Sequence, residues 1–290
     1  MTQQNNHLNR MRSYSSIFSS TYFSNLIRLN DYKFINDKIL EYDIDLRGGT
    51  ILTYNDYIKY IYKELRKTYR NEYVYKNTFL NEIIIKNYGL KDSNVINEFR
   101  VGNSIADLVM FNGTSKAFEI KTELDSNKRL SNQLLDYKKI FKQSYIITHE
   151  HLKDKYLEED ADAGIIILKE NPRSLKMEEV RPAKVNKTIC PRTLMRIVRT
   201  QEYKNIVISY YGYLPKMNSF NMFEVCEKLI TKIPNDLLNK LFIEELKKRK
   251  TNTKNLKVYQ KELTQLSLAM NLGEKKYSKL VEALNQPIKY

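Results

Sequence analysis

The chain has 290 residues, of which 42% are hydrophobic and 29% are charged. This composition is near the globular average, so a wholly disordered chain is excluded. No apolar run approaches the roughly 18 residues of a membrane helix, and the polar N-terminus lacks the apolar segment of a secretory signal. Two cysteines, Cys190 and Cys226, are too few for a disulfide framework or a four-cysteine zinc site. We therefore expect a cytoplasmic protein that makes no membrane contact.

The net charge of +15 is unevenly distributed along the chain. Residues 1–183 carry 28 basic and 25 acidic side chains, whereas residues 184–290 carry 21 basic and 9 acidic ones. Binding to a polyanion releases condensed counterions for each phosphate contact, so nucleic acid is the partner that this excess favours. A basic surface with no specific partner remains the alternative.

The first elements along the chain are predicted to be helical. Thr53 is placed to cap a helix over about 54–70, in which apolar residues recur at helical spacing. A second helix is expected over about 78–88, with Gly89 at its end.

The pattern changes after Asp92 to short, β-branched and aromatic segments. Strands are expected over about 95–101, 105–111 and 116–124, with a hairpin turn at 112–114. A helix over about 127–142, a strand over 145–148, a polar connection at 152–162 and a strand over 164–168 follow. This order predicts a mixed α/β layer with helices packed on a sheet.

The chain beyond residue 184 is predicted to be helical. Four segments fit this pattern, namely 192–202, 219–232, 235–249 and 256–284. We expect this basic helical C-terminal region to hold nucleic acid, or to serve for a protein partner or self-association.

Asp107, Glu119 and Lys121 are the candidate chemical residues. Glu119 and Lys121 are two apart on one strand, so their side chains share a face. If Asp107 lies opposite Glu119 across the turn, all three converge; a slip of one residue would send Asp107 to the other face. Carboxylate oxygens suit Mg²⁺ or Mn²⁺, and a lysine can orient water and offset charge at a phosphate. The trio therefore favours phosphodiester hydrolysis, with an ion pair on an edge hairpin as the alternative.

The spacing of Asp107 and Glu119-Ile120-Lys121, with the predicted order of elements, resembles the PD-(D/E)XK nuclease superfamily. Gln133 and Tyr137 are similar to the QxxxY element of its RecB-like members. This resemblance implies a restriction-endonuclease-like mixed sheet flanked by helices. It also implies that Glu82, Asp107 and Glu119 bind Mg²⁺ or Mn²⁺, with Glu98 as a competing choice for Glu82.

The resemblance further implies roles for the helix after the hairpin, where Arg129, Gln133 and Tyr137 would contact nucleic acid and position the site. Ala106 stands where the motif often has proline. We expect three parts: a helical N-terminal extension (1–72), a nuclease-like domain (73–183) and the basic helical C-terminal region (184–290).

The function expected from these observations is a metal-dependent nuclease that acts on DNA. The alternatives are a non-catalytic nucleic-acid-binding or assembly protein on a nuclease fold, and an RNA nuclease or defence effector activated by a partner. His149 and His151 are expected to form a surface cluster at a strand end, and Asp125 to cap the next helix.

Overall fold

The computed structural model describes residues 2–46, 49, 51–171 and 174–289. It folds as two compact units, each built from segments that are distant in sequence. The first unit comprises Met1–Asn87, Asn171–Leu175 and Lys254–Tyr290, and the second comprises Tyr88–Glu170 and Lys176–Thr253. The sequence predicted three consecutive parts, whereas each unit combines separate segments of the chain. The helices after residue 184 are therefore divided between the two units.

The first unit is helical. Its helices are α1 (Thr2–Ile17), α2 (Ser20–Leu29), α3 (Lys33–Tyr42), α4 (Tyr54–Thr68), α5 (Glu72–Phe79), a π-helical turn (Leu80–Ile84), α6 (Ile85–Asn87), α13 (Thr264–Ala269) and α14 (Glu274–Leu284). The predicted cap of α4 is confirmed, because Thr53 accepts a hydrogen bond from the Asp56 N–H and the Asp56 carboxylate accepts one from the Thr53 N–H.

Asp43 is the polar centre of this helical unit. Its buried carboxylate accepts hydrogen bonds from the hydroxyls of Tyr14 (2.6 Å) and Tyr57 (2.7 Å), and it pairs with Arg10. These contacts join α1 and α4 to the end of α3. A buried carboxylate with three donors is fully compensated for its lost hydration.

The second unit is a mixed α/β layer, as predicted. Its elements are β1 (Asn94–Val101), β2 (Ser104–Phe111), β3 (Ser115–Lys121), α7 (Leu130–Lys138), β4 (Gln143–His149), α8 (Lys153–Glu159), β5 (Gly164–Asn171), β6 (Ser174–Arg181), α9 (Pro191–Ile197), α10 (Thr200–Tyr211), α11 (Met222–Ile230) and α12 (Asn235–Lys247).

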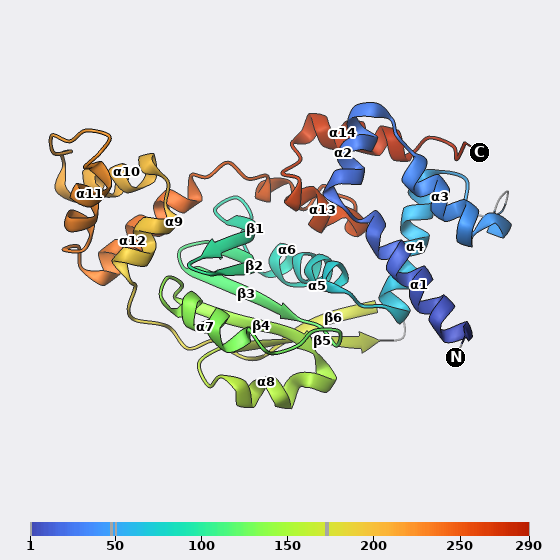
Figure 1. Cartoon of the computed structure of the whole chain (residues 1–290), viewed down its shortest axis with the longest axis horizontal. Coiled ribbons are helices and arrows are strands. Elements are labelled where there is room, and N and C mark those ends of the chain that lie inside the picture. Colours follow the sequence, from blue (N-terminus) through green and yellow to red (C-terminus); the bar gives the residue numbers. More distant parts are fainter. Residues whose placement is uncertain (1, 47–48, 50, 172–173, 290) are drawn as a thin grey trace. The chain divides into compact units, whose positions relative to one another are not determined.

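The six strands follow one another across the sheet in sequence order (Figure 1). The first three form an antiparallel meander, while β3, β4 and β5 are parallel. Helices α7 and α8 are the crossovers that the parallel pairs need. One face of the sheet packs against α7 and α9–α12 in a single apolar core that includes Val109, Ala117, Ile146 and Ile165.

Several expectations about elements were wrong, among them the single helix over 192–202, which the structure divides between α9 and α10. The expected helix over 256–284 is broken at Asn271–Gly273 into α13 and α14, since Asn271 has a left-handed backbone with φ of 47°. The polar connection contains α8, and β6 had no counterpart in the prediction. The helix expected from 78 begins earlier, at Glu72, with Asn71 capping it.

Candidate active site

The β2–β3 hairpin has the register that the convergence of the trio requires. Leu108 pairs with Phe118, so the next positions toward the open end of the hairpin are Asp107 and Glu119. Asp107 is half-buried, and its Oδ2 accepts a hydrogen bond of 2.7 Å from the backbone N–H of Ile120. The structure therefore places Asp107 against the strand that carries Glu119.

Glu119 is the centre of a buried hydrogen-bond network. Its side chain is 4% exposed, on the face of β3 that packs against α7. Oε1 accepts hydrogen bonds from Lys121 Nζ (2.8 Å) and Gln133 Nε2 (2.6 Å), and Oε2 accepts one from the Tyr137 hydroxyl (2.6 Å). Two of these donors come from one face of α7, as their spacing of four residues predicts.

Lys121 lies at the end of β3 with only 8% of its surface exposed. Besides Glu119, its ammonium donates to the Gln133 side-chain oxygen at 3.1 Å. Gln133 thus contacts both charged residues, donating to one and accepting from the other. A buried ion pair keeps its charges only when further hydrogen bonds satisfy them, and Gln133 supplies these.

Tyr137 connects the site to β2. Its hydroxyl lies 3.0 Å from the Ile105 carbonyl oxygen as well as near Glu119. Burial raises the pKa of Tyr137 far above its ordinary value, and the negative charges of Glu119 and then Asp107 raise that pKa further. The phenol therefore remains a protonated donor at every physiological pH, and both carboxylates act on it electrostatically.

The strand alternation breaks at Asp107, which the sequence did not indicate. Ala106 and Val109 both lie in the core under α7 although they are three residues apart. On β1, Glu98 takes the position opposite Asp107 and has a left-handed backbone with φ of 54°. Such a conformation is uncommon for glutamate and, within strands, is a local irregularity that can re-aim a side chain.

Two predicted residues have no recorded hydrogen bond or ion pair to Asp107, Glu119 or Lys121 within the described part of the chain. Arg129 is exposed at the N-cap position of α7, one turn before Gln133. Glu82 belongs to the first unit, where it lies in the π-helical turn and pairs with Lys86 at 2.7 Å. The roles that the resemblance implies for them stay predictions.

His149 was expected at the surface, and this was wrong. It is 2% exposed at the end of β4, with Nε2 lying 3.2 Å from Glu170 and 3.7 Å from Glu123. His149 Nδ1 accepts from the His151 N–H, and the two rings lie 4.8 Å apart. The neighbouring Asp125 does not cap α7; it accepts from the N–H and hydroxyl of Thr122 instead.

These residues fall within a recognisable family match. Residues 65–271 match the model described as Bacteriophage P4 protein cII, which is more than half of the chain. The chain belongs to the bacteriophage P4 protein cII family. Protein cII of Enterobacteria phage P4 is 27% identical over 179 residues, which are 61% of this chain and 67% of that protein.

The cII-family match includes both β2 and β3, α7 and the π-helical turn. One solved structure is also similar, the SPO1766 protein of unknown function from Silicibacter pomeroyi. It is 12% identical, and the match covers 49% of this chain and 94% of that chain with a TM-score of 0.32. At that score the likeness supports no argument about fold or function.

The described part of this cII-family chain contains no group of three or more His, Cys, Asp or Glu side chains arranged to hold a metal ion. The carboxylates of the described cluster are those of Asp107 and Glu119. Among the described residues, no helix combines the length and apolar character needed to cross a bilayer.

Proposed function

We propose that this cII-family protein is a metal-dependent nuclease that hydrolyses phosphodiester bonds of DNA. The observation that carries the proposal is the position of Asp107 across from Glu119, with Lys121 two residues further along β3 and with Gln133 and Tyr137 bonded to Glu119. Acids and an amine are costly to bury unless they are paired and hydrogen-bonded, so a cluster held this closely favours a functional role over a chance ion pair.

The donor set fits a hard divalent cation. Mg²⁺ and Mn²⁺ prefer oxygen, and Mg²⁺ is commonly held by one or two carboxylates together with water and substrate phosphates. Asp107 and Glu119 would hold such an ion. When bound, the ion would polarise the phosphate and lower the pKa of a coordinated water.

The other residues of the cluster would act through position and charge. Lys121, with its amine beside Glu119, would orient the attacking water and offset negative charge that develops at phosphorus. Gln133 and Tyr137 would fix the Glu119 carboxylate from α7. Arg129, exposed at the start of the same helix, would contact a backbone phosphate of the substrate.

The net charge of +15 favours a nucleic acid as the partner, and we propose that this nucleic acid is DNA. The basic helices after residue 184 would hold substrate, a protein partner or a second copy. We also propose a cytoplasmic location. We further propose that the chain is a member of the PD-(D/E)XK nuclease superfamily.

One observation favours a second candidate, a non-catalytic nucleic-acid-binding protein on the same fold. Both oxygens of Glu119 already accept hydrogen bonds, from three donors in all. A carboxylate satisfied in this way can be purely structural, because it loses nothing when no cation is present. This candidate predicts DNA binding in EDTA and no turnover.

The test is an incubation of the purified chain with single-stranded DNA, duplex DNA and RNA, each with Mg²⁺, Mn²⁺ or EDTA. We expect DNA cleavage with either metal and none in EDTA. Salt-sensitive binding without cleavage under every metal condition would contradict the nuclease and support the second candidate.

A further inference from the structure

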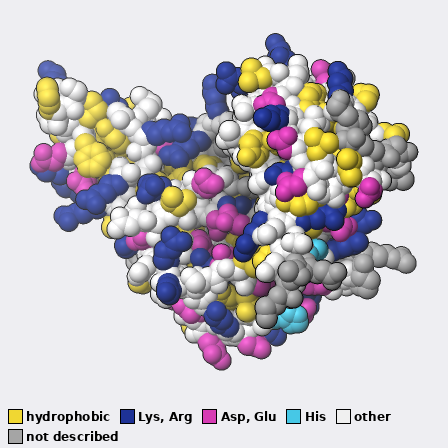
Figure 2. All heavy atoms as spheres, turned by 45° about the vertical axis from the view of Figure 1, so that its right-hand side comes forward, with side chains coloured by type: hydrophobic (Ala, Val, Ile, Leu, Met, Phe, Trp, Pro, Cys, Tyr) yellow, Lys and Arg dark blue, Asp and Glu magenta, His cyan; other side chains and the backbone are white. Residues whose placement is uncertain are grey.

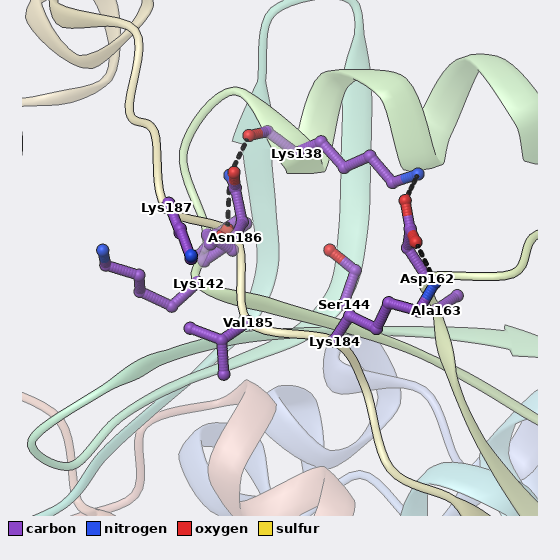
Figure 3. A pocket seen from close by; sticks show the side chains of 10 residues that line it. Lys138, Lys142, Ser144, Asp162, Ala163, Lys184, Val185, Asn186 and Lys187 are labelled. Carbon is purple, nitrogen blue, oxygen red and sulfur yellow. Dashed lines mark hydrogen bonds and ion pairs between the residues drawn. The ribbon is translucent and has the colours of Figure 1, made fainter.

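A pocket of about 240 Å³ lies in the second unit, apart from the proposed active site (Figure 3). Its lining residues come from the end of α7, the start of β4, the residues before β5 and the segment after β6; they are Lys138, Phe141, Lys142, Ser144, Asp162, Ala163, Lys184, Val185, Asn186 and Lys187. We call this the lysine pocket. Its volume is below the roughly 300–1,000 Å³ of pockets for drug-sized ligands, so it suits a small group.

The lysine pocket has two sides. On one side the lysines are paired with aspartates, and on the other side, which we call the available side, the lysines have no strong ion pair among the described residues. Lys138 pairs with Asp160 (2.9 Å) and Asp162 (3.1 Å), and Lys184 pairs with Asp162 (3.0 Å). Lys142 and Lys187 are the cations of the other side (Figure 3).

The two lysines of the available side are weakly engaged. Lys142 reaches Asp236 at 3.3 Å, but that carboxylate is 92% exposed, and such pairs contribute little. For Lys187, the structure records no side-chain hydrogen bond or ion pair with any described residue. Both ammonium groups can therefore turn to an anion without breaking a strong contact.

Ser144 adds a neutral donor to the pocket. The residue is 6% exposed, and no hydrogen bond of its hydroxyl is recorded within the described ranges. Figure 3 shows its side chain between the two lysine sides. A hydroxyl that faces the pocket without a recorded partner can donate a hydrogen bond to a bound anion.

The walls of the lysine pocket are pre-organised. The Asn186 N–H donates to the Lys142 carbonyl at 2.7 Å, and its side-chain amide donates to the carbonyls of Lys138, Phe141 and Thr188. The Lys184 N–H donates to the Asp162 carbonyl at 2.9 Å. A site whose walls are already fixed loses little conformational entropy on binding.

We propose that the lysine pocket binds a backbone phosphate of nucleic acid, through Lys142, Lys187 and the Ser144 hydroxyl. Two ammonium groups and a hydroxyl donor match the oxygens of a phosphodiester. The end of α7 presents partial negative charge here, which these lysines must offset. On β4, Ser144 lies two residues, or about 7 Å, before Ile146. Ile146 is the residue that pairs with Glu119 of β3. We take this phosphate to belong to the nucleic acid that the proposed site would cleave, and to that extent the inference rests on the proposed function.

The test measures DNA binding in EDTA, where no cleavage occurs. A short fluorescent oligonucleotide is titrated at several salt concentrations with the wild-type chain, with Lys142→Gln/Lys187→Gln and with Ser144→Ala. The matched control is Lys91→Gln/Lys155→Gln, which removes two exposed lysines of the same unit from outside both the pocket and the basic region after residue 184. Inorganic phosphate is titrated in parallel.

The pocket variant should bind DNA on the order of tenfold more weakly at low salt, and the slope of log K against log salt should fall by about 1 to 2. The Ser144 variant should show a smaller loss, and the control should retain the wild-type slope. Equal losses in the pocket variant and the control would overturn the proposal, as would a loss of inorganic phosphate binding alone.

This result is separable from the fate of the proposed nuclease. Weakened binding by the pocket variant, in a chain that cleaves nothing with any metal, would keep the phosphate site and remove the nuclease. Metal-dependent cleavage with unchanged binding by the pocket variant would do the reverse.

Discussion

At the scale of single residues, the site is organised by the number of donors around one buried carboxylate. Glu119 accepts hydrogen bonds from Lys121, Gln133 and Tyr137, and the Tyr137 hydroxyl also lies against the Ile105 carbonyl. The phenol is thus a positioning group that holds β3 and β2 to α7. Removing the hydroxyl takes away the recorded donor to Glu119 Oε2 and leaves that buried oxygen without a hydrogen bond from a described residue.

Tyr137→Phe should therefore lower the free energy of unfolding by about 1–3 kcal/mol, because a buried carboxylate oxygen loses its donor. The measurement is urea denaturation followed by circular dichroism. Tyr156→Phe is the matched control: Tyr156 is equally buried in the same unit, but its hydroxyl bonds to the neutral Asn127 side chain at 2.7 Å. Equal destabilisation by the two changes would argue against a special role of the Glu119 contact.

The candidate residues could be predicted because their pattern is local. The hairpin follows from its turn residues and the Gln133–Tyr137 spacing from helical geometry, whereas the register was left open between two alternatives that the structure decides. The irregularity at Asp107 could not be predicted, since it depends on how β1 and β2 distort together at Glu98. Burial of His149 was also hidden, because Glu170 reaches it from another strand.

At the scale of elements, close packing between neighbouring strands limits what β5 can carry. A Cβ at Gly164 would lie 2.4 Å from the Tyr145 ring and 2.7 Å from the Ala183 nitrogen. The segment after β6 could move away only by breaking backbone hydrogen bonds such as the one from the Lys184 N–H to the Asp162 carbonyl. Gly89, by comparison, has no atom within 4 Å of an added Cβ.

Gly164→Ala should destabilise the protein by about 1–3 kcal/mol or more through overpacking, whereas Gly89→Ala should be close to neutral. Thermal unfolding of both variants checks this. A Gly164→Ala protein with the wild-type midpoint would show that the strands are packed less tightly than described.

The contact between α10 and the end of α12 is electrostatic. The Glu202 carboxylate accepts a hydrogen bond of 2.7 Å from Arg249 Nε. It also accepts one from the backbone N–H of Arg199, at the start of α10. Burial would raise the pKa of Glu202, but these donors outweigh it and hold that pKa below its ordinary value. The resulting stabilisation is fully present above the ordinary pKa of a glutamate, and it is lost as the pH falls through the lowered value in the folded state.

Glu202→Gln should cost about 2–3 kcal/mol at neutral pH, and the difference from wild type should shrink as the pH falls below about 4. Thermal midpoints measured between neutral pH and pH 3 test the sign. Glu224→Gln is the control, since its pair with Lys228 on α11 is exposed and should matter little. A difference that grows in acid would contradict the assignment.

Elements with a strong period were predictable, whereas those that depend on long-range packing were not. The helix α4, the meander and α7 follow from spacing and turn residues. The strand β6 is polar and mostly half-exposed, so its sequence carries little strand signal. The break between α13 and α14 occurs in a segment whose apolar stripe continues on both sides, which hid the left-handed Asn271.

At the scale of the whole molecule, the excess of positive charge belongs mainly to residues 184–290, which carry 21 basic and 9 acidic side chains. Figure 2 shows Lys and Arg side chains over much of the visible face, with acidic side chains between them. With +15 overall, the chain should bind polyanions with a strong dependence on salt. Specific contacts must then come from defined places, of which the Glu119 cluster and the lysine pocket are the two that we propose.

The most direct test of the Glu119 cluster is the rate of DNA cleavage in Mg²⁺ by the wild type, Asp107→Asn and Lys121→Met, with Lys128→Met as a control on an exposed lysine before α7. The account predicts cleavage that is abolished by EDTA, that falls by about 100-fold or more in the first two variants and that is unchanged in the control. Cleavage at the wild-type rate in both Asp107→Asn and Lys121→Met, with each variant folded, would contradict it.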